Sequence, residues 1–96
     1  MTEEQYEAAQ QLESQLFIRL KEAMEQGNVK SETSMEVVEL HKRWLSFYWT
    51  KYTKDAHVGL AQMYINDERF IAYYNGRVGN GATLFLHDAI MAYSKL

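Results

Sequence analysis

The chain has 96 residues, of which 47% are hydrophobic and 24% are charged, and its formal net charge is −3. This length suits one domain with a single core, and the composition is ordinary for a soluble globular protein. The negative charge argues against a dedicated nucleic-acid binder, which would carry a basic face, and the lack of cysteine excludes disulfides, thiolate metal sites and cysteine nucleophiles within these residues.

The chain contains no proline and only five glycines. Because proline and glycine are the residues that interrupt helices, their scarcity predicts an all-α fold. No apolar run approaches the eighteen or so residues of a membrane span, and Met1 leads into acidic residues rather than a signal peptide. We therefore expect a cytoplasmic protein with one domain, residues 1–96, and no membrane contact.

The first predicted helix runs from about Thr2 to Gln26. Its apolar residues recur at every fourth position, and they are Leu12, Leu16, Leu20 and Met24. Acidic residues fill its N-terminal half, where they suit the helix dipole, and Gly27 supplies a left-handed end. Only Ile18 falls outside the apolar face, so the alternative to a plain core helix is one that also packs in a dimer or continues upstream.

The second predicted helix starts near Thr33, which forms a capping box with Glu36, and runs to about Tyr52. On a helical wheel its apolar residues cover an arc of roughly 200°, about twice the width that one core-facing stripe requires. These residues are Val37, Val38, Leu40, His41, Trp44, Leu45, Phe47, Tyr48, Trp49 and Tyr52. Such a helix must bury two flanks, one of them against something other than its own core.

Three shorter helices are predicted in the rest of the chain. Residues 56–65 are nearly all apolar, so this helix should be the most enclosed of the set. Asn66-Asp67 ends it and caps a fourth helix that Gly76 closes. A last helix covers about residues 82–95, with Leu84 and Met91 together on the side away from the core.

The residues give little support for catalysis. His41, His57 and His87 follow one another at intervals of sixteen and thirty residues, whereas a helical zinc site wants histidines at i and i+4. The serines lack the setting of a nucleophile elbow, and the glycines at 76–81 lack the strand and lysine of a phosphate-binding loop. We expect no enzyme, no metal and no cofactor.

Basic and aromatic residues alternate between His41 and Lys54, which resembles a platform for stacking nucleic-acid bases. However, the wheel places Lys42 and Arg43 opposite Trp44 and Tyr48, so one strand could not use both sets. The charges are better explained as a solvated face, and we expect no direct nucleic-acid binding.

Binding of a small molecule fits the aromatic surplus better. Aromatic pairs contribute about 0.5–1.5 kcal/mol beyond area burial, whereas micromolar affinity needs about −8 kcal/mol net of ordering costs. A cleft lined by several rings is therefore required. The alternative is that most of these rings are simply core.

The run from His41 to Tyr74 resembles the TipA-type (TipAS) antibiotic-recognition domain. The resemblance lies in H-K-R-W-L-x-F-Y-W from His41, in H-V-G-L-A-Q-M-Y-I-N-D-E-R-F from His57, and in A-Y-Y-N-G ending at Gly76. The tail Leu86-His87-Asp88-Ala89-Ile90 resembles that domain's last helix, so the similarity covers most of the chain.

The resemblance implies a compact, five-helix, globin-like domain. In that family the domain usually serves as the effector-binding part of a MerR-type transcriptional activator, or acts alone in drug resistance by sequestering antibiotics such as thiopeptides. Binding orders helices in the best-known member. Two departures matter here: these residues include no DNA-binding segment, and without cysteine any capture must be noncovalent.

We predict that the binding residues lie along residues 44–74. The ligand-binding set is Trp44, Tyr48, Trp49, Tyr52, His57, Met63, Tyr64, Tyr73 and Tyr74. The first four form one wall, and Met63 and the last three tyrosines form the other. His41 and His57 orient polar groups or serve structure, and Asp67 and Arg69 form a cap and an ion pair. The alternative function is a protein-interaction or dimerisation module without a small-molecule ligand, in which the same surface and the Leu84–Met91 pair bury against another chain, for example a second copy in a homodimer.

Overall fold

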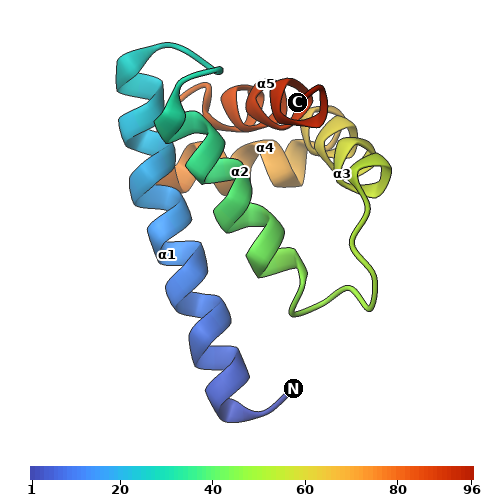
Figure 1. Cartoon of the computed structure of the whole chain (residues 1–96). Helices are drawn as coiled ribbons and strands as arrows, with labels where there is room; N and C mark the ends of the chain where they lie inside the picture. Colours follow the sequence, from blue (N-terminus) through green and yellow to red (C-terminus); the bar gives the residue numbers. More distant parts are fainter.

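The computed structural model describes residues 1–96 and consists of five helices with no strand, which confirms the predicted all-α class. The helices are α1 (Glu3–Gln26), α2 (Glu32–Leu45), α3 (Lys54–Asn66), α4 (Glu68–Val78) and α5 (Ala82–Ser94). Helices α1 and α2 form an antiparallel pair, and α3, α4 and α5 pack around one end of it (Figure 1).

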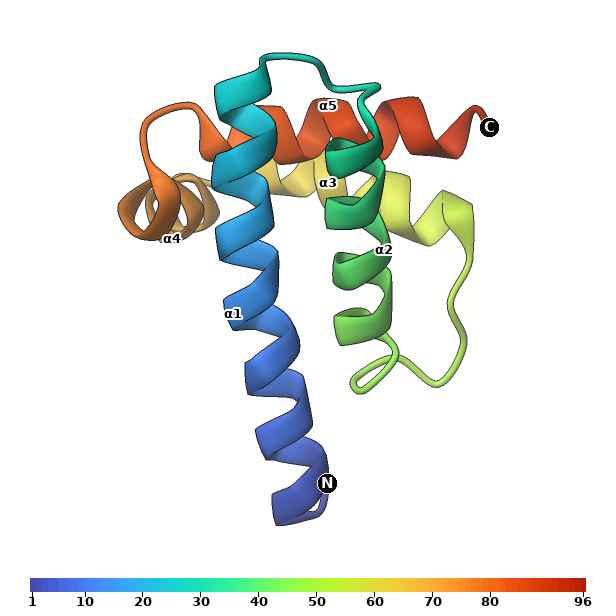
Figure 2. The same cartoon turned by 60° about the vertical axis from the view of Figure 1, so that its left-hand side comes forward.

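The start of α1 extends past the rest of the bundle, as two views of the ribbon show (Figures 1 and 2). Thr2 and Gln5 cap it reciprocally, with each side chain accepting a hydrogen bond from the other residue's backbone N–H. At the other end, Gly27 has a φ of 72° and its N–H donates to the carbonyl of Ala23, as predicted.

The core lies where the C-terminal half of α1 meets the other four helices. Its buried side chains are Leu16, Leu20, Ala23, Val37, Val38, Ala61, Tyr64, Tyr74, Ala82, Leu86, Ala89 and Ile90. The leucines of α1 point inward at the predicted four-residue spacing, whereas Ile18 is 62% exposed. Periodicity therefore identified the inner face of α1 correctly.

The second helix is shorter than predicted, because α2 ends at Leu45 rather than near Tyr52. The Ser46 hydroxyl donates to the carbonyl of Lys42 at 2.9 Å, a local bond of the kind that competes with helix continuation. A turn then carries the chain to Trp49, and residues 50–52 make no backbone hydrogen bond. The predicted apolar arc therefore applies only as far as Leu45, and Trp49 and Tyr52 project from a connection, residues 46–53, which we call the aromatic segment.

Three further predictions about the helices were wrong. Ser31 caps α2 instead of Thr33, and accepts a hydrogen bond from the Ser34 N–H at 3.0 Å. Helix α3 is not the most enclosed, since only His57, Ala61 and Tyr64 are buried on it, because it lies at the edge of the bundle (Figure 1). Helix α4 continues through Gly76 to Val78, and Gly79, with a φ of 142°, ends it.

The predicted roles of Asp67 and Arg69 are confirmed. The Asp67 carboxylate accepts a hydrogen bond from the Arg69 backbone N–H at 2.9 Å and pairs with its guanidinium at 2.8 Å. No helix of the chain combines the length and the apolar character that a membrane crossing requires.

Candidate functional site

Eleven aromatic and imidazole rings form one connected cluster, in which each ring has a neighbour with its centroid within 6.2 Å. We call it the ring cluster, and its members are Phe17, His41, Trp44, Tyr48, Trp49, Tyr52, His57, Tyr64, Phe70, Tyr73 and Tyr74. All helices except α5 contribute to it, together with the aromatic segment. It joins the core to the surface at the end of α2.

A chain of four hydrogen bonds passes through this cluster. The Tyr52 hydroxyl lies 2.6 Å from Nδ1 of His57, and Nε2 of His57 lies 2.7 Å from Nδ1 of His41. Nε2 of His41 is 3.3 Å from the Tyr64 hydroxyl, which is 3.4 Å from that of Tyr74. We call these five residues the hydrogen-bonded chain. It satisfies polar groups that would otherwise be costly to bury in an apolar core.

Both histidines of this chain are neutral at physiological pH. Burial lowers the pKa of His41 from 6.5 to about 3, and the nearby His57 adds to the effect. Burial also lowers the pKa of His57 to about 4, with a contribution from Lys42. Burial raises the pKa of Tyr64 and that of Tyr74 above the ordinary value of a phenol. A proton is therefore costly to add to or remove from this part of the protein.

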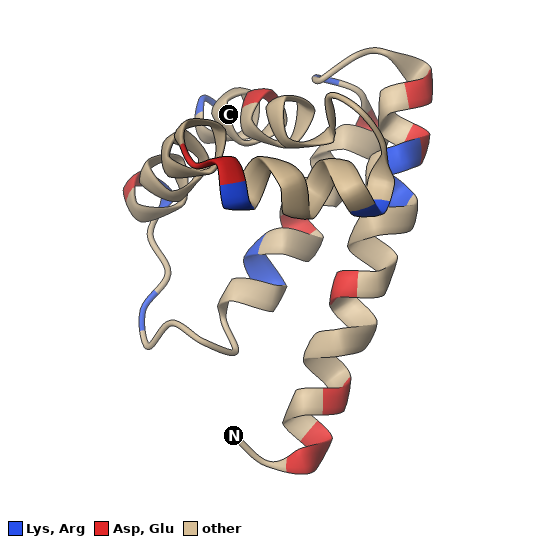
Figure 3. Cartoon of the chain, turned by 180° about the vertical axis from the view of Figure 1, so that it is seen from behind, with Lys and Arg blue, Asp and Glu red and all other residues tan.

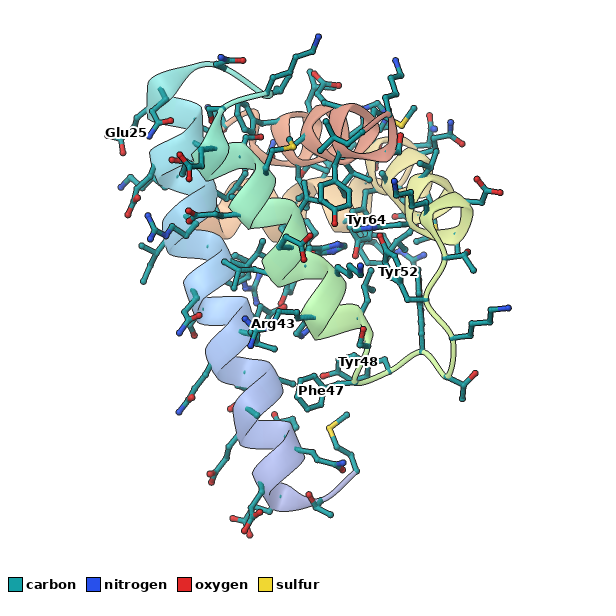
Figure 4. The ribbon with its side chains drawn as sticks, in the orientation of Figure 1. Glu25, Arg43, Phe47, Tyr48, Tyr52 and Tyr64 are labelled. Carbon is teal, nitrogen blue, oxygen red and sulfur yellow. The ribbon has the colours of Figure 1, made fainter.

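The ring cluster reaches the surface through the aromatic segment. Trp44 packs on Tyr48 with centroids 5.0 Å apart, and Trp49 stacks on Tyr52 at 6.2 Å. Tyr48 is 52% exposed, and the ammonium of Lys42 lies 4.9 Å from the centre of the Tyr52 ring. In Figure 4, Tyr48 lies at the far end of α2 and Tyr52 and Tyr64 lie beside that helix.

Eight of the nine predicted binding residues belong to the ring cluster, and Met63 is the exception, with 42% of its surface exposed on α3. The two predicted walls do not face each other across a gap, because the rings of His41 and His57 lie between them and pack on Trp44 and Tyr52 on one side and on Tyr64 on the other. Tyr64 and Tyr74 are only 3% and 2% exposed. Tyr73 is partly buried, and α1 holds its hydroxyl, which donates to Glu13 at 2.7 Å. None of the nine side chains lines a surface hollow.

Two hollows lie along the seam between α1 and α2. One, of about 460 Å³, includes Leu12, Arg43 and Phe47. A second, of about 480 Å³, includes Ile18 and Leu40. Both are also lined by Gln15 and Arg43, so together they form one α1–α2 groove. Figure 4 shows Arg43 and Phe47 between the two helices.

Sequence reasoning did not select the groove residues. Phe47 was inside the aromatic run, so its residue type was a usable signal. Leu12 and Ile18 belong to the first helix, and their position beside α2 depends on how the two helices pack. The first half of α1 carries only acidic charge, as the view from behind shows (Figure 3), but none of these acidic residues lines the groove.

Comparison with protein-family models gives a match over residues 1–93, to the model described as the TipAS antibiotic-recognition domain. No curated protein and no solved structure matches the chain.

Proposed function

The chain belongs to the TipAS antibiotic-recognition family, and on this basis we propose that it binds bulky, largely apolar and aromatic antibiotics noncovalently and does no chemistry on them. We further propose that it acts in the cytoplasm, as the effector-sensing domain of a MerR-type transcription regulator or as a drug-sequestering protein in drug resistance. Its partner is then a small molecule such as a thiopeptide, and it has no direct contact with nucleic acid.

One observation supports this proposal above the others: the ring cluster reaches the surface on a segment with few backbone constraints. Residues 50–52 make no backbone hydrogen bond, and Tyr52 is held by its side-chain contacts to His57 and Lys42. Segments with few backbone hydrogen bonds open at low free-energy cost. Movement of this segment would expose Trp44, Trp49 and His57 to a ligand.

The α1–α2 groove offers a starting point for such a ligand. Each of its two hollows, of about 480 and 460 Å³, falls within the range of about 300–1,000 Å³ that is common for small-molecule sites. Phe47, which precedes Tyr48 in the sequence, lines the second of them. A flat, rigid ligand that entered here would meet the apolar side chains of α1 first and the ring cluster next. Several rings are needed to reach micromolar affinity, about −8 kcal/mol.

The predicted residues have different roles in this proposal. Trp44, Tyr48, Trp49 and Tyr52 contact the ligand, because they form the accessible end of the ring cluster. His57 orients the polar groups of the ligand. Tyr64 and Tyr74 hold the histidines in place from the buried end of the hydrogen-bonded chain. Met63 and Tyr73 take part only if α3 and α4 shift, since Met63 lies outside the cluster and Tyr73 is bonded to Glu13.

Titration of tryptophan fluorescence tests the proposal, because Trp44 and Trp49 are the only tryptophans. We expect saturable quenching by a thiopeptide and by an albicidin-like compound. The variants W44F and W49F each keep one tryptophan and so report the quenching of that residue alone. The matched control is L84A, which removes an apolar side chain that is 55% exposed on α5, and it should bind like the wild type. Absence of saturable quenching in folded protein would contradict the proposal.

The exposed side chain of Ile18 favours a second candidate, a homodimer that buries the α1–α2 groove. Basic and acidic side chains surround Ile18, with Arg19 lying 3.5 Å from Glu36, so two copies could pair opposite charges across a two-fold axis. Sedimentation at increasing concentration would show such a dimer, and I18D would abolish it. If I18D changes neither mass nor ligand binding, the groove has no part in either function.

A further inference from the structure

The hydroxyl groups of Tyr64 and Tyr74 are buried, and the few acceptors within their reach fix the direction of their hydrogen bonds. The hydroxyl of Tyr74 has one hydrogen-bond partner, the Tyr64 hydroxyl, and Tyr64 has one more, Nε2 of His41. Both tyrosines are at least 97% buried, so water does not replace a missing partner. Two hydroxyl hydrogens therefore share one acceptor outside the pair, and that acceptor is Nε2 of His41.

Only one arrangement satisfies both hydrogens. Tyr74 donates to Tyr64, and Tyr64 donates to Nε2 of His41. In the reverse arrangement Tyr64 donates to Tyr74, and the Tyr74 hydrogen is left buried without an acceptor, which is the costly outcome for a polar group. At the buried end of the hydrogen-bonded chain, the donor and the acceptor of each bond are therefore fixed. We call this direction of donation the sense of the chain.

This sense passes outward through the histidines. A neutral imidazole has one N–H donor and one acceptor nitrogen. Since Nε2 of His41 accepts, its Nδ1 carries the hydrogen and donates to Nε2 of His57 at 2.7 Å. Nδ1 of His57 then carries the hydrogen and donates to the Tyr52 hydroxyl oxygen at 2.6 Å. The hydrogen of the Tyr52 hydroxyl is left free to point away from the protein.

We propose that the Tyr64–Tyr74 pair sets the hydrogen-bonding sense of the whole chain, so that the binding site presents a donor and selects rigid aromatic ligands that carry an exposed acceptor, such as a ring nitrogen or carbonyl oxygen. With Tyr52 in place the donor is its hydroxyl, and with Tyr52 displaced it is Nδ1–H of His57. The ligand meets a donor in both positions. This inference rests on the proposed function for the existence of the ligand, but the tautomers are a property of the protein alone.

Nitrogen-15 NMR of the histidine side chains tests the sense directly, because it separates the two neutral tautomers. In wild-type protein at neutral pH, His41 and His57 should both be in the Nδ1–H form. The double variant Y64F/Y74F removes both phenol hydrogens and leaves Nε2 of His41 without a partner in either tautomer, so the tyrosines no longer select the Nδ1–H form, and the Nε2–H form of His57 should then appear. The single variant Y74F is the matched control. It leaves the hydroxyl hydrogen of Tyr64 and its acceptor, Nε2 of His41, so His41 and His57 should keep their wild-type tautomers.

An Nε2–H tautomer at His57 in the wild type would overturn the proposal. Unchanged tautomers in a folded Y64F/Y74F variant would show that the tyrosine pair does not set the sense. Circular dichroism establishes whether that variant is folded, and the wild-type measurement decides the sense even if it is not.

Two probes of the same shape test the ligand preference. The probes are 4-phenylquinoline, which has a ring-nitrogen acceptor, and 1-phenylnaphthalene, which has none. We expect wild-type protein to bind the quinoline roughly three- to tenfold more tightly, the contribution of one neutral hydrogen bond, and Y64F/Y74F to lose most of this difference. Equal binding of both probes overturns the ligand preference alone. Binding of neither overturns the proposed function and the preference together, whereas the tautomers still decide the sense of the chain.

Discussion

Nδ1 of His41 lies 2.7 Å from Nε2 of His57, and the two rings are stacked at 15° inside the protein. Helix α2 supplies one ring and α3 supplies the other. Because each ring is neutral, the contact is a hydrogen bond between a donor and an acceptor. Protonation of both would put two positive charges at this distance in a region of low dielectric constant. The free energy of unfolding therefore depends on pH through this contact.

The first prediction concerns the stability of the protein in mild acid. The pKa values of His41 and His57 are lowered from 6.5 to about 3 and about 4 in the folded state, so the unfolded chain binds more protons below pH 6.5. The free energy of unfolding should be at its full value above about pH 7 and should fall as the pH drops from 6.5 to 4. The slope is at most about 1.4 kcal/mol per pH unit for each histidine.

Urea unfolding at pH 7.5, 6, 5 and 4.5 measures this slope. H57Q removes one of the two groups and should reduce the slope by about half. His87 is on α5 outside the hydrogen-bonded chain, where it pairs with Asp88, so H87Q is the matched control and should keep the steep dependence. A midpoint that does not change between pH 7.5 and 5 would contradict the role of the buried pair.

The second prediction is that Tyr52 anchors the aromatic segment. Y52F removes the hydroxyl that bonds to His57 and leaves Nδ1 of a buried imidazole without a partner. We expect the free energy of unfolding to fall by about 1–3 kcal/mol, the usual cost of such an unsatisfied group. Urea unfolding measures it.

Tyr48 offers the matched control for Tyr52, four residues away on the same segment. Its hydroxyl makes no hydrogen bond in the structure, and it is half exposed. Y48F should therefore change the free energy of unfolding by no more than about 0.5 kcal/mol. If the two variants lose equal stability, the bond to His57 does not anchor the segment.

Local patterns predicted most of the fold, and the reasons lie in particular residues. The leucines of α1 recur every fourth position, Gly27 ends that helix with a positive φ, and Asp67 caps α4. Each of these signals depends on residues within one turn of helix. The end of α2 was missed because Leu45 to Tyr52 keeps an apolar character that fits a helical wheel, whereas the chain leaves the helix there and Tyr52 reaches His57.

The candidate site was less predictable, because its contacts are not local. Sixteen residues separate His41 from His57, and twenty-three separate His41 from Tyr64, and no spacing rule brings them together. The aromatic residue types did indicate where the ring cluster lies. The α1–α2 groove could not be predicted, since it depends on the relative placement of two helices.

The third prediction concerns the start of α5, where the capping residue is Gly81 and offers no side chain. The Asn75 side chain on α4 substitutes for it, because its oxygen accepts hydrogen bonds from the N–H and from the hydroxyl of Thr83, both at 3.0 Å. N75A should lower the free energy of unfolding by about 1–2 kcal/mol, as the loss of a cap does. Urea unfolding checks this value, and N80A, which changes an exposed asparagine of the same connection, should have little effect.

The fourth prediction compares two glycines that differ in backbone conformation. Gly59 lies in α3 with open space around the position of an added Cβ, so G59A should raise the free energy of unfolding by about 0.5–1 kcal/mol through helix propensity. Gly27 has equal space but a φ of 72°, so G27A should lower it by about 1 kcal/mol. Thermal unfolding of both variants checks the pair. A gain in G27A would mean that α1 does not end in the left-handed conformation, and a loss in G59A would mean that the exposed face of α3 contacts another molecule.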